Sequence, residues 1–167
     1  MDYIIREAKI EDCHELSYLK LVIWNQVYID IYPKYKFDNY NYENEEKKFE
    51  KILNNKEVKL FVVESNNKIL GYMSCGSPIR KFMDYKQEIG LLYLEEQLKY
   101  KGIGKILFNK AYNIIKNNGY DEFFISCNKY NINARKFYEK MGGKLIHVDE
   151  DNLDKSLPQV KYLYSIK

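Results

Sequence analysis

Residues 98–116 have the sequence LKYKGIGKILFNKAYNIIK, in which two glycines stand between lysines at the start of a predicted helix. The apolar residues after Gly104 recur at helical spacing, and Gly119 is placed to end the helix. A helix N-terminus has unpaired N–H groups and partial positive charge, and glycine lets a ligand approach the backbone closely. The stretch therefore predicts either an anion site, such as one for a pyrophosphate, or only the turn that begins a helix.

Two known phosphate-binding loops are excluded by the residues around the glycines. A Walker loop needs Ser or Thr after its lysine, and Lys105 is followed by Ile106. A dinucleotide-binding fingerprint needs a third glycine at the position of Leu107. The glycine pair alone is weak evidence for a phosphate site, so the rest of the chain has to decide.

Length and composition predict one folded domain over residues 1–167. Apolar residues make up 46% of the chain and charged residues 31%, which is typical of a globular protein. The net charge of +3 is too small to indicate a nucleic-acid partner, and no apolar run approaches the roughly 20 residues of a membrane helix. The N-terminus lacks a signal-peptide pattern, and the three cysteines form no CxxC pair. We therefore expect a cytoplasmic protein without a membrane partner, a disulfide framework or a metal site.

The hydrophobic pattern predicts an α/β chain, with an α+β mixed sheet that has helices on both faces. Asn66 and Asn67 tolerate the positive φ of a tight hairpin turn. Asp12 is placed to cap the first helix. Residues 28–42 are aromatic, are interrupted by Pro33, and predict a loop with short helical pieces. Strands are predicted at 3–8, 60–63, 69–73, 88–94, 123–127, 144–148 and 160–166, and helices after Asp12 and at 43–53, 102–117 and 133–141.

Two motifs in the second half of the chain carry a family resemblance. EIGLLYLEEQLKYKGIGKILFNKA, residues 88–111, is followed after one short strand by NINARKFYEKMGGK, residues 131–144. Together they resemble the GNAT superfamily of acyl-CoA-dependent N-acyltransferases. The first matches a strand, a Q/R-x-x-G-x-G/A loop and a helix, with Lys99 in place of the usual Gln or Arg. The second matches N-x-x-A-x-x-x-Y-x-x-x-G at Asn131, Ala134, Tyr138 and Gly142.

The resemblance implies a GNAT-type fold, with a mostly antiparallel central sheet that is splayed at its middle. It implies acetyl-CoA as the co-substrate, without a metal. Backbone groups of the splayed strand would hold the pantetheine arm, loop amides would hold the pyrophosphate, and two asparagines would reach the arm. The implied cofactor residues are Leu92, Tyr93 and Leu94 on the strand, Lys99, Tyr100, Lys101, Gly102, Ile103, Gly104 and Lys105 in the loop, and Asn131 and Asn133 beyond it.

The resemblance also implies direct transfer of an acetyl group to an amine. Tyr138 would protonate the leaving thiolate; otherwise it is a core aromatic of an amphipathic helix. Glu88 is the candidate base that takes the proton of the amine, and the alternative is a solvated glutamate at a strand end. Asp84 and a chain of waters are further candidates, whereas Ser126 lacks the chemistry. Backbone amides near Leu94 would polarise the thioester carbonyl.

The acceptor is expected to contact the first helix and the loop after it, at Trp24, Tyr28 and Tyr32. The alternative is that these rings only pack beneath the loop. The acidic stretch from Asp149 to Asp151, with Asp154, either attracts a cationic amine or is a solvated loop. We expect a small primary amine, polyamine-like or another amino compound, as the acceptor. Dimers are common in such families, so a homodimer is one expectation.

Three other functions compete with this interpretation. Acetylation of a protein N-terminus or of lysine would need an open, charge-lined groove. A non-catalytic acyl-CoA-binding module would need the loop but not Tyr138. A nucleic-acid binder would explain the lysines near the glycine loop, but no RNA-binding motif accompanies them.

Overall fold

The computed structural model describes residues 1–167, and its strands form one sheet in the order β1-β2-β3-β4-β5-β7-β6. All neighbouring strands are antiparallel except β4 and β5, which are parallel. This arrangement confirms the predicted mixed, mostly antiparallel sheet. The strands are β1 Ile4–Glu7, β2 Val58–Ser65, β3 Lys68–Gly76, β4 Glu88–Leu94, β5 Glu122–Asn128, β6 Lys144–Val148 and β7 Gln159–Ser165.

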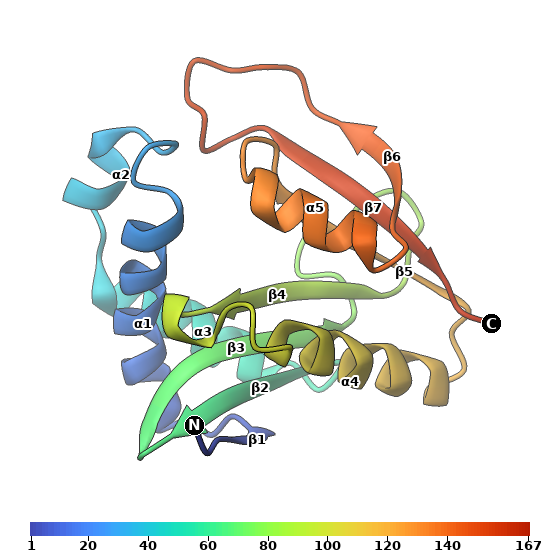
Figure 1. Cartoon of the computed structure of the whole chain (residues 1–167), viewed down its shortest axis with the longest axis horizontal. Helices are drawn as coiled ribbons and strands as arrows, with labels where there is room; N and C mark the ends of the chain where they lie inside the picture. Colours follow the sequence, from blue (N-terminus) through green and yellow to red (C-terminus); the bar gives the residue numbers. More distant parts are fainter.

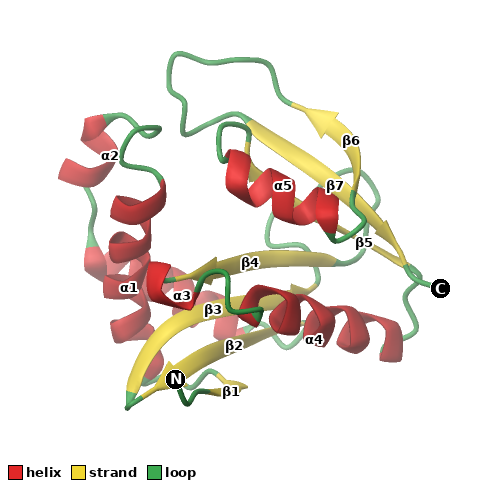
Figure 2. Ribbon diagram, viewed as in Figure 1, coloured by secondary structure: helices red, strands yellow, loops and turns green.

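Helices cover both faces of the sheet, as the hydrophobic pattern predicts (Figure 1). One apolar cluster joins α4 and α5 to one face, and a second joins α1 and α3 to the other. Figure 2 shows α4 and α5 in front of the sheet and α3 behind it. The helices are α1 Asp12–Val27, α2 Lys34–Asp38, α3 Tyr42–Asn54, α4 Ile103–Asn117 and α5 Ile132–Lys140, with a short 3-10 helix at Glu96–Leu98.

The hairpin between β2 and β3 forms at the predicted turn. Asn66 and Asn67 have φ of 51° and 60°, and Ser65 pairs with Lys68. Strand residues alternate between the two cores, so Phe61 and Val63 face α4 whereas Leu60 and Val62 face α1 and α3. Helices therefore pack on both faces of this hairpin.

One local prediction is wrong, because Asp12 does not cap the first helix. The residue at the cap position is Glu11, which makes no side-chain cap bond. Asp12 is the first residue of α1, and its carboxylate accepts hydrogen bonds from the N–H of Lys9 at 2.7 Å and from the guanidinium of Arg6 at 2.8 and 3.0 Å. The carboxylate of Asp12 binds the guanidinium of Arg6 on β1 and does not accept a hydrogen bond from the helix N–H groups, because the charged partner is the stronger donor.

The sheet opens between β4 and β5. These strands pair only at Glu88 with Phe124 and at Ile89 with Ile125. The register of β3 against β4 shifts at the next residue, because Ser74 pairs with Leu91 and Cys75 with Ile89, so Gly90 is an extra residue in β4. A bulge bends its strand. Beyond it the two halves of the sheet diverge (Figure 2), and α5 covers the second half.

No helix in the structure is long and apolar enough to cross a membrane. All three cysteines are buried and unpaired.

Candidate active site

A cavity of about 790 Å³ occupies the opening between β4 and β5. Its walls come from the end of α1, from β4, from the loop before α4, from Ser126 and Cys127 of β5, and from α5. Loop 99–105 lies at one end of it. The strands meet at the other end, where Ile89, Gly90 and Ser126 line the wall. The cavity is therefore long, and it joins a helix N-terminus to the point at which the sheet splits.

The loop before α4 presents unpaired backbone donors. The N–H of Lys99 donates to the carbonyl of Glu96, and the N–H of Ile106 to that of Gly102. Between them, the six N–H groups of residues 100–105 donate to no backbone or side-chain acceptor of the chain. Exposed donors in a row at a helix N-terminus are suited to phosphate oxygens.

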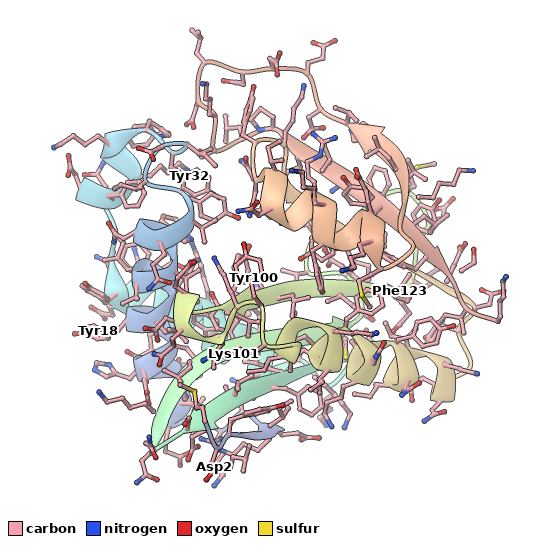
Figure 3. All side chains as sticks on the ribbon, viewed as in Figure 1. Asp2, Tyr18, Tyr32, Tyr100, Lys101 and Phe123 are labelled. Atoms are coloured by element: carbon pink, nitrogen blue, oxygen red, sulfur yellow. The ribbon has the colours of Figure 1, made fainter.

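The conformation of this loop depends on two residues with positive φ. Gly102 has φ of 80°, which glycine adopts without strain. Tyr100 has φ of 58°, which is a disfavoured conformation for a bulky residue. Its side chain is 90% exposed, so no packing within the chain offsets this strain. Figure 3 shows Tyr100 rising from the loop beside Lys101. Strain of this kind is concentrated at ligand-binding sites.

The loop side chains divide into two groups. Lys99, Tyr100 and Lys105 line the cavity with the two glycines. Lys101 and Ile103 do not line it, and Ile103 is 2% exposed within the core. The predicted contact with a pyrophosphate runs through the backbone amides of this loop, so these two side chains are not needed for it. The first turn of α4 directs the side chain of Ile103 into the core. Only its backbone N–H group is therefore available to a ligand in the cavity.

Strand β4 contributes its three predicted residues. Leu92, Tyr93 and Leu94 all line the cavity. Beyond Ile89 the edge of β4 that faces β5 has no strand partner. Backbone groups along this edge are thus available to a ligand that extends from the loop toward Gly90.

Helix α5 forms the opposite wall. Asn131 caps it, because its Oδ1 accepts a hydrogen bond from the N–H of Ala134 at 3.1 Å. The Nδ2 of the same residue donates to the Tyr28 hydroxyl at 3.2 Å, which connects α5 to the end of α1. Asn131 and Asn133 both line the cavity.

Tyr138 of α5 reaches the cavity from within the core. It is 6% exposed and lies beside Phe137 and Tyr162. Its hydroxyl makes no hydrogen bond within the chain, and the only fully buried unpaired polar side-chain atom is the Oγ of Ser74. The Tyr138 hydroxyl is therefore free to donate into the cavity. Burial raises the pKa of Tyr138 well above its ordinary value, so the phenol keeps its proton.

Glu88 lies at the first pair of β4 with β5 but does not line this cavity. Alternation places it on the opposite face of the sheet from its neighbour Ile89, which belongs to the α4 core. The carboxylate is 6% exposed and accepts a hydrogen bond from the N–H of Ile79 at 2.8 Å. Burial raises the pKa of Glu88 to about 7, against the opposing effects of that N–H, Lys161 and Arg80.

The aromatic residues of α1 and of the loop after it form a cluster, and only one of the three expected at the acceptor lines the cavity. Tyr28 lines the cavity, and Tyr32 stacks on Tyr28 with ring centroids 4.2 Å apart. Trp24 meets the edge of Tyr32 at 5.2 Å and does not line the cavity (Figure 3 shows Tyr32 beside α1). Trp24 and Tyr32 do not line this cavity, and both rings pack against Phe37.

The aspartates of the loop between β6 and β7 are paired within the chain. Asp149 accepts from the N–H of Gln159 at 2.9 Å and lies 2.8 Å from His147. Asp151 accepts from the Tyr130 hydroxyl at 2.6 Å, and Asp154 accepts from the Tyr35 hydroxyl. These contacts shape the loop and leave less free negative charge than its sequence suggests.

Sequence reasoning missed Lys161 of β7. Its Nζ donates to the Oγ of Ser126 at 2.8 Å, and it is paired with Ser126 across the two strands. Burial lowers the pKa of this amine. Strand alternation could have placed Lys161 opposite the buried Val160 and Tyr162, but nothing local indicates that the ring of Phe82 covers it.

Residues 24–143 match the model of the acetyltransferase (GNAT) family. The uncharacterized N-acetyltransferase YuaI of Bacillus subtilis is 28% identical over 124 residues, which are 72% of this chain and 69% of that protein. Spermidine N(1)-acetyltransferase of Thermoplasma acidophilum is 27% identical over 156 residues, which are 89% of this chain and 92% of that protein.

Solved structures share the fold over the whole chain. The PaiA N-acetyltransferase of Thermoplasma acidophilum, solved with coenzyme A, is 22% identical with a TM-score of 0.75 and covers 99% of both chains. An N-acetyltransferase of Staphylococcus aureus is 24% identical with a TM-score of 0.74 and covers 100% of both.

Proposed function

The chain belongs to the acetyltransferase (GNAT) family, and from this we propose that it transfers the acetyl group of acetyl-CoA directly to a primary amine of a small molecule. The observation that carries the proposal is the row of free N–H groups at residues 100–105, at one end of a cavity that runs to the split in the sheet. Such a row fits a pyrophosphate, and the unpaired edge of β4 fits an extended amide-bearing arm.

The orientation of acetyl-CoA follows from the two ends of the cavity. With its phosphates at loop 100–105, the thioester lies toward Gly90 and Leu92, where the strands separate. Tyr138 on α5 lines the same cavity and keeps its proton. We assign it the role of donating this proton to the sulfur of coenzyme A as the thioester breaks.

The amine must be neutral before it attacks, and we assign the removal of its proton to Glu88. A base works best when its pKa lies near the operating pH, and that of Glu88 is about 7. Because Glu88 lies on the face opposite the α4 core, the amine would approach from the face of α1 and α3, while acetyl-CoA enters from the face of α4 and α5. The split between β4 and β5 would bring the two substrates together.

A polyamine-like compound is the acceptor that we place first. A relative along 89% of this chain is named as a spermidine acetyltransferase. The ring of Tyr28, which lines the cavity, offers an aromatic contact to an alkylammonium chain. Another small amino compound is the alternative within this proposal.

Calorimetric titration of acetyl-CoA into the protein and into Gly104→Val tests the cofactor site. A Cβ at Gly104 would lie 3.4 Å from the ring of Phe137 and 3.7 Å from Leu94, so the methyl groups of valine would enter the cavity. We expect micromolar binding to the wild type and at least about tenfold weaker binding to the variant, a loss of about 1.4 kcal/mol. Desulfo-coenzyme A should bind like acetyl-CoA, and ATP should not. No binding of acetyl-CoA to the wild type would refute the proposal.

An amine panel tests the acceptor. Release of coenzyme A is followed with spermidine, an amino sugar and a lysine-containing peptide. Turnover with the peptide alone would replace the small-molecule acceptor by a protein. Binding of acetyl-CoA without turnover on any amine would favour a non-catalytic acyl-CoA-binding module.

A further inference from the structure

Lys161 places an amine at the point where the sheet splits. Ser126 immediately follows Ile125, which makes the last pair of β5 with β4, and it lines the cavity. The Nζ of Lys161 lies 2.8 Å from the Oγ of this serine. Lys161 itself does not line the cavity, and one small side chain separates its amine from the end to which we assign the thioester.

Small residues lie on the two strands beside this amine. Gly90 has no side chain, and a Cβ there would come within 2.8 Å of Ile79 and 3.0 Å of the Ser74 hydroxyl. Ser126 borders the opening from β5. Gly90 therefore allows Ile79 and Ser74 to pack directly against β4, and Ser126 is the side chain that lies between the amine and the cavity.

The surroundings of Lys161 match what an amine substrate requires. The Nζ lies over the rings of Phe82 and Phe124, 4.9 and 5.7 Å from their centroids. Its burial favours the neutral amine, whereas Glu88 and Asp149 favour the ammonium and Arg80 opposes it. Glu88, to which we assign removal of the acceptor proton, pairs with Phe124, whose ring lies under Lys161, so the two residues share one face of the sheet.

We propose that Lys161 is itself an acetyl acceptor, so that the protein acetylates its own Lys161 when acetyl-CoA is bound and no small amine is present. This inference rests on the proposed function, because it requires acetyl-CoA in the cavity. It adds a modification site, and it makes Lys161 an internal counterpart of the external amine.

The transfer is balanced without another reactant. Glu88 takes a proton from the Lys161 ammonium through a water, because the two groups form no direct ion pair, and the neutral Nζ leaves Ser126 and attacks the thioester carbonyl carbon. The C–N bond forms and the C–S bond breaks, and the departing thiolate takes a proton from Tyr138. The second proton of the nitrogen passes to solvent, which also restores the proton of Tyr138. The products are N-acetyl-lysine and free coenzyme A.

Mass spectrometry with acetyl-CoA that carries a deuterated acetyl group tests the proposal. The label separates acetylation in the tube from any acquired during expression. The full chain is incubated without amine and cleaved at acidic residues, and label at Lys161 is compared with label at Lys144, an exposed lysine on β6. We expect Lys161 to gain label at least about tenfold faster than Lys144, because the bound thioester is held beside it.

Excess coenzyme A provides the control for site specificity. It should suppress labelling of Lys161 and leave labelling of Lys144 unchanged, because only the first depends on the cavity. Spermidine, if it is the acceptor, should also slow labelling of Lys161. Label at Lys161 that appears no faster than at Lys144, or that persists in excess coenzyme A, would overturn the proposal.

Failure of this inference differs from failure of the proposed function. If acetyl-CoA binds and an external amine is acetylated while Lys161 stays unlabelled, only the inference falls. If acetyl-CoA does not bind the wild type in the calorimeter, the proposed function and the acetylation of Lys161 are both refuted. The variant Lys161→Arg, which keeps the charge but lacks a reactive amine, should lose the fast label and keep the slow label at Lys144.

Discussion

The side-chain amide of Asn131 donates to the hydroxyl of Tyr28 at 3.2 Å, which joins the cap of α5 to the end of α1 beside the cavity. Both residues line the cavity, although 103 positions separate them in the chain. The wall assigned to the acceptor is thus fixed to the wall assigned to acetyl-CoA by one neutral hydrogen bond.

Tyr28→Phe removes this bond and keeps the ring. We expect the KM for the amine to rise about fivefold, which corresponds to one neutral hydrogen bond, while the affinity for acetyl-CoA stays nearly constant. Steady-state kinetics and calorimetry measure the two quantities. Tyr120→Phe is the matched control, because Tyr120 is exposed in the turn after α4. An unchanged KM would place the acceptor away from Tyr28.

Tyr138→Phe tests the proton donor. We expect kcat to fall about a hundredfold, because the leaving thiolate then takes its proton from water. Binding of acetyl-CoA should persist, since the ring and its contacts with Phe137 remain. Tyr112→Phe on α4 controls for loss of a tyrosine hydroxyl elsewhere. A kcat equal to that of the wild type would reduce Tyr138 to a core aromatic.

The pH profile tests Glu88. Because the acid form of Glu88 cannot take a proton, kcat/KM should rise with pH through an inflection at about 7. The acceptor amine deprotonates near its own pKa of about 10, so the two inflections are separable. Glu88→Gln should remove the lower one and reduce the plateau about a hundredfold. A lower inflection that survives in the variant would assign the base role to another group, for which Asp84 is the first candidate.

Gly102 and Gly119 allow the loop to be tested apart from backbone strain. They have φ of 80° and 87° at opposite ends of α4, and a Cβ at either would meet nothing within 4 Å. Alanine at each should therefore lower the free energy of unfolding by a similar amount, about 1–2 kcal/mol. Only Gly102→Ala should weaken the binding of acetyl-CoA, because only Gly102 lies among the free N–H groups, which backbone strain at this residue would displace. Equal affinities in the two variants would argue against the loop as the phosphate site.

The sequence predicted the parts of the fold that depend on local chemistry. Asn66 and Asn67 specify the hairpin turn, and the apolar period from Ile103 specifies α4, because each depends on residues close together in the chain. The prediction that Asp12 caps α1 is wrong because the Asp12 carboxylate binds Arg6, which lies on another element and is not indicated by the local sequence.

The site was predictable where backbone placement decides it and not where packing does. The position of the glycine loop at a helix N-terminus follows from local spacing, whereas Tyr138 was singled out by the family resemblance and its role stays a prediction. The burial of Glu88, by contrast, depends on the segment around Ile79, which lies outside the motif and whose N–H donates to the carboxylate. The role of Lys161 depends on Ser126 and Phe82, two residues far from it in sequence, so no local pattern indicates it.

Asp12 gives a stability prediction with a defined pH dependence. Its side chain is 11% exposed, and it pairs with Arg6, which lowers the pKa of Asp12 below its ordinary value of 3.8. A carboxylate whose pKa is lower in the folded state stabilises the fold above the unfolded value and loses that contribution as the pH falls through the folded value. Asp12→Asn should therefore lower the free energy of unfolding by about 1.5–3 kcal/mol at neutral pH, by loss of charge-assisted hydrogen bonds.

Urea denaturation at several pH values measures this difference. The free energies of unfolding of the wild type and of Asp12→Asn should converge below the folded pKa of Asp12, because a protonated Asp12 side chain is neutral like that of the variant. Asp38→Asn is the control, since its ion pair with Lys34 is exposed at 54% and 89% and should contribute almost nothing at any pH. If the two curves stay equally far apart at low pH, the loss comes from the shape of the side chain rather than its charge, and the ion pair with Arg6 is not what holds β1 to α1.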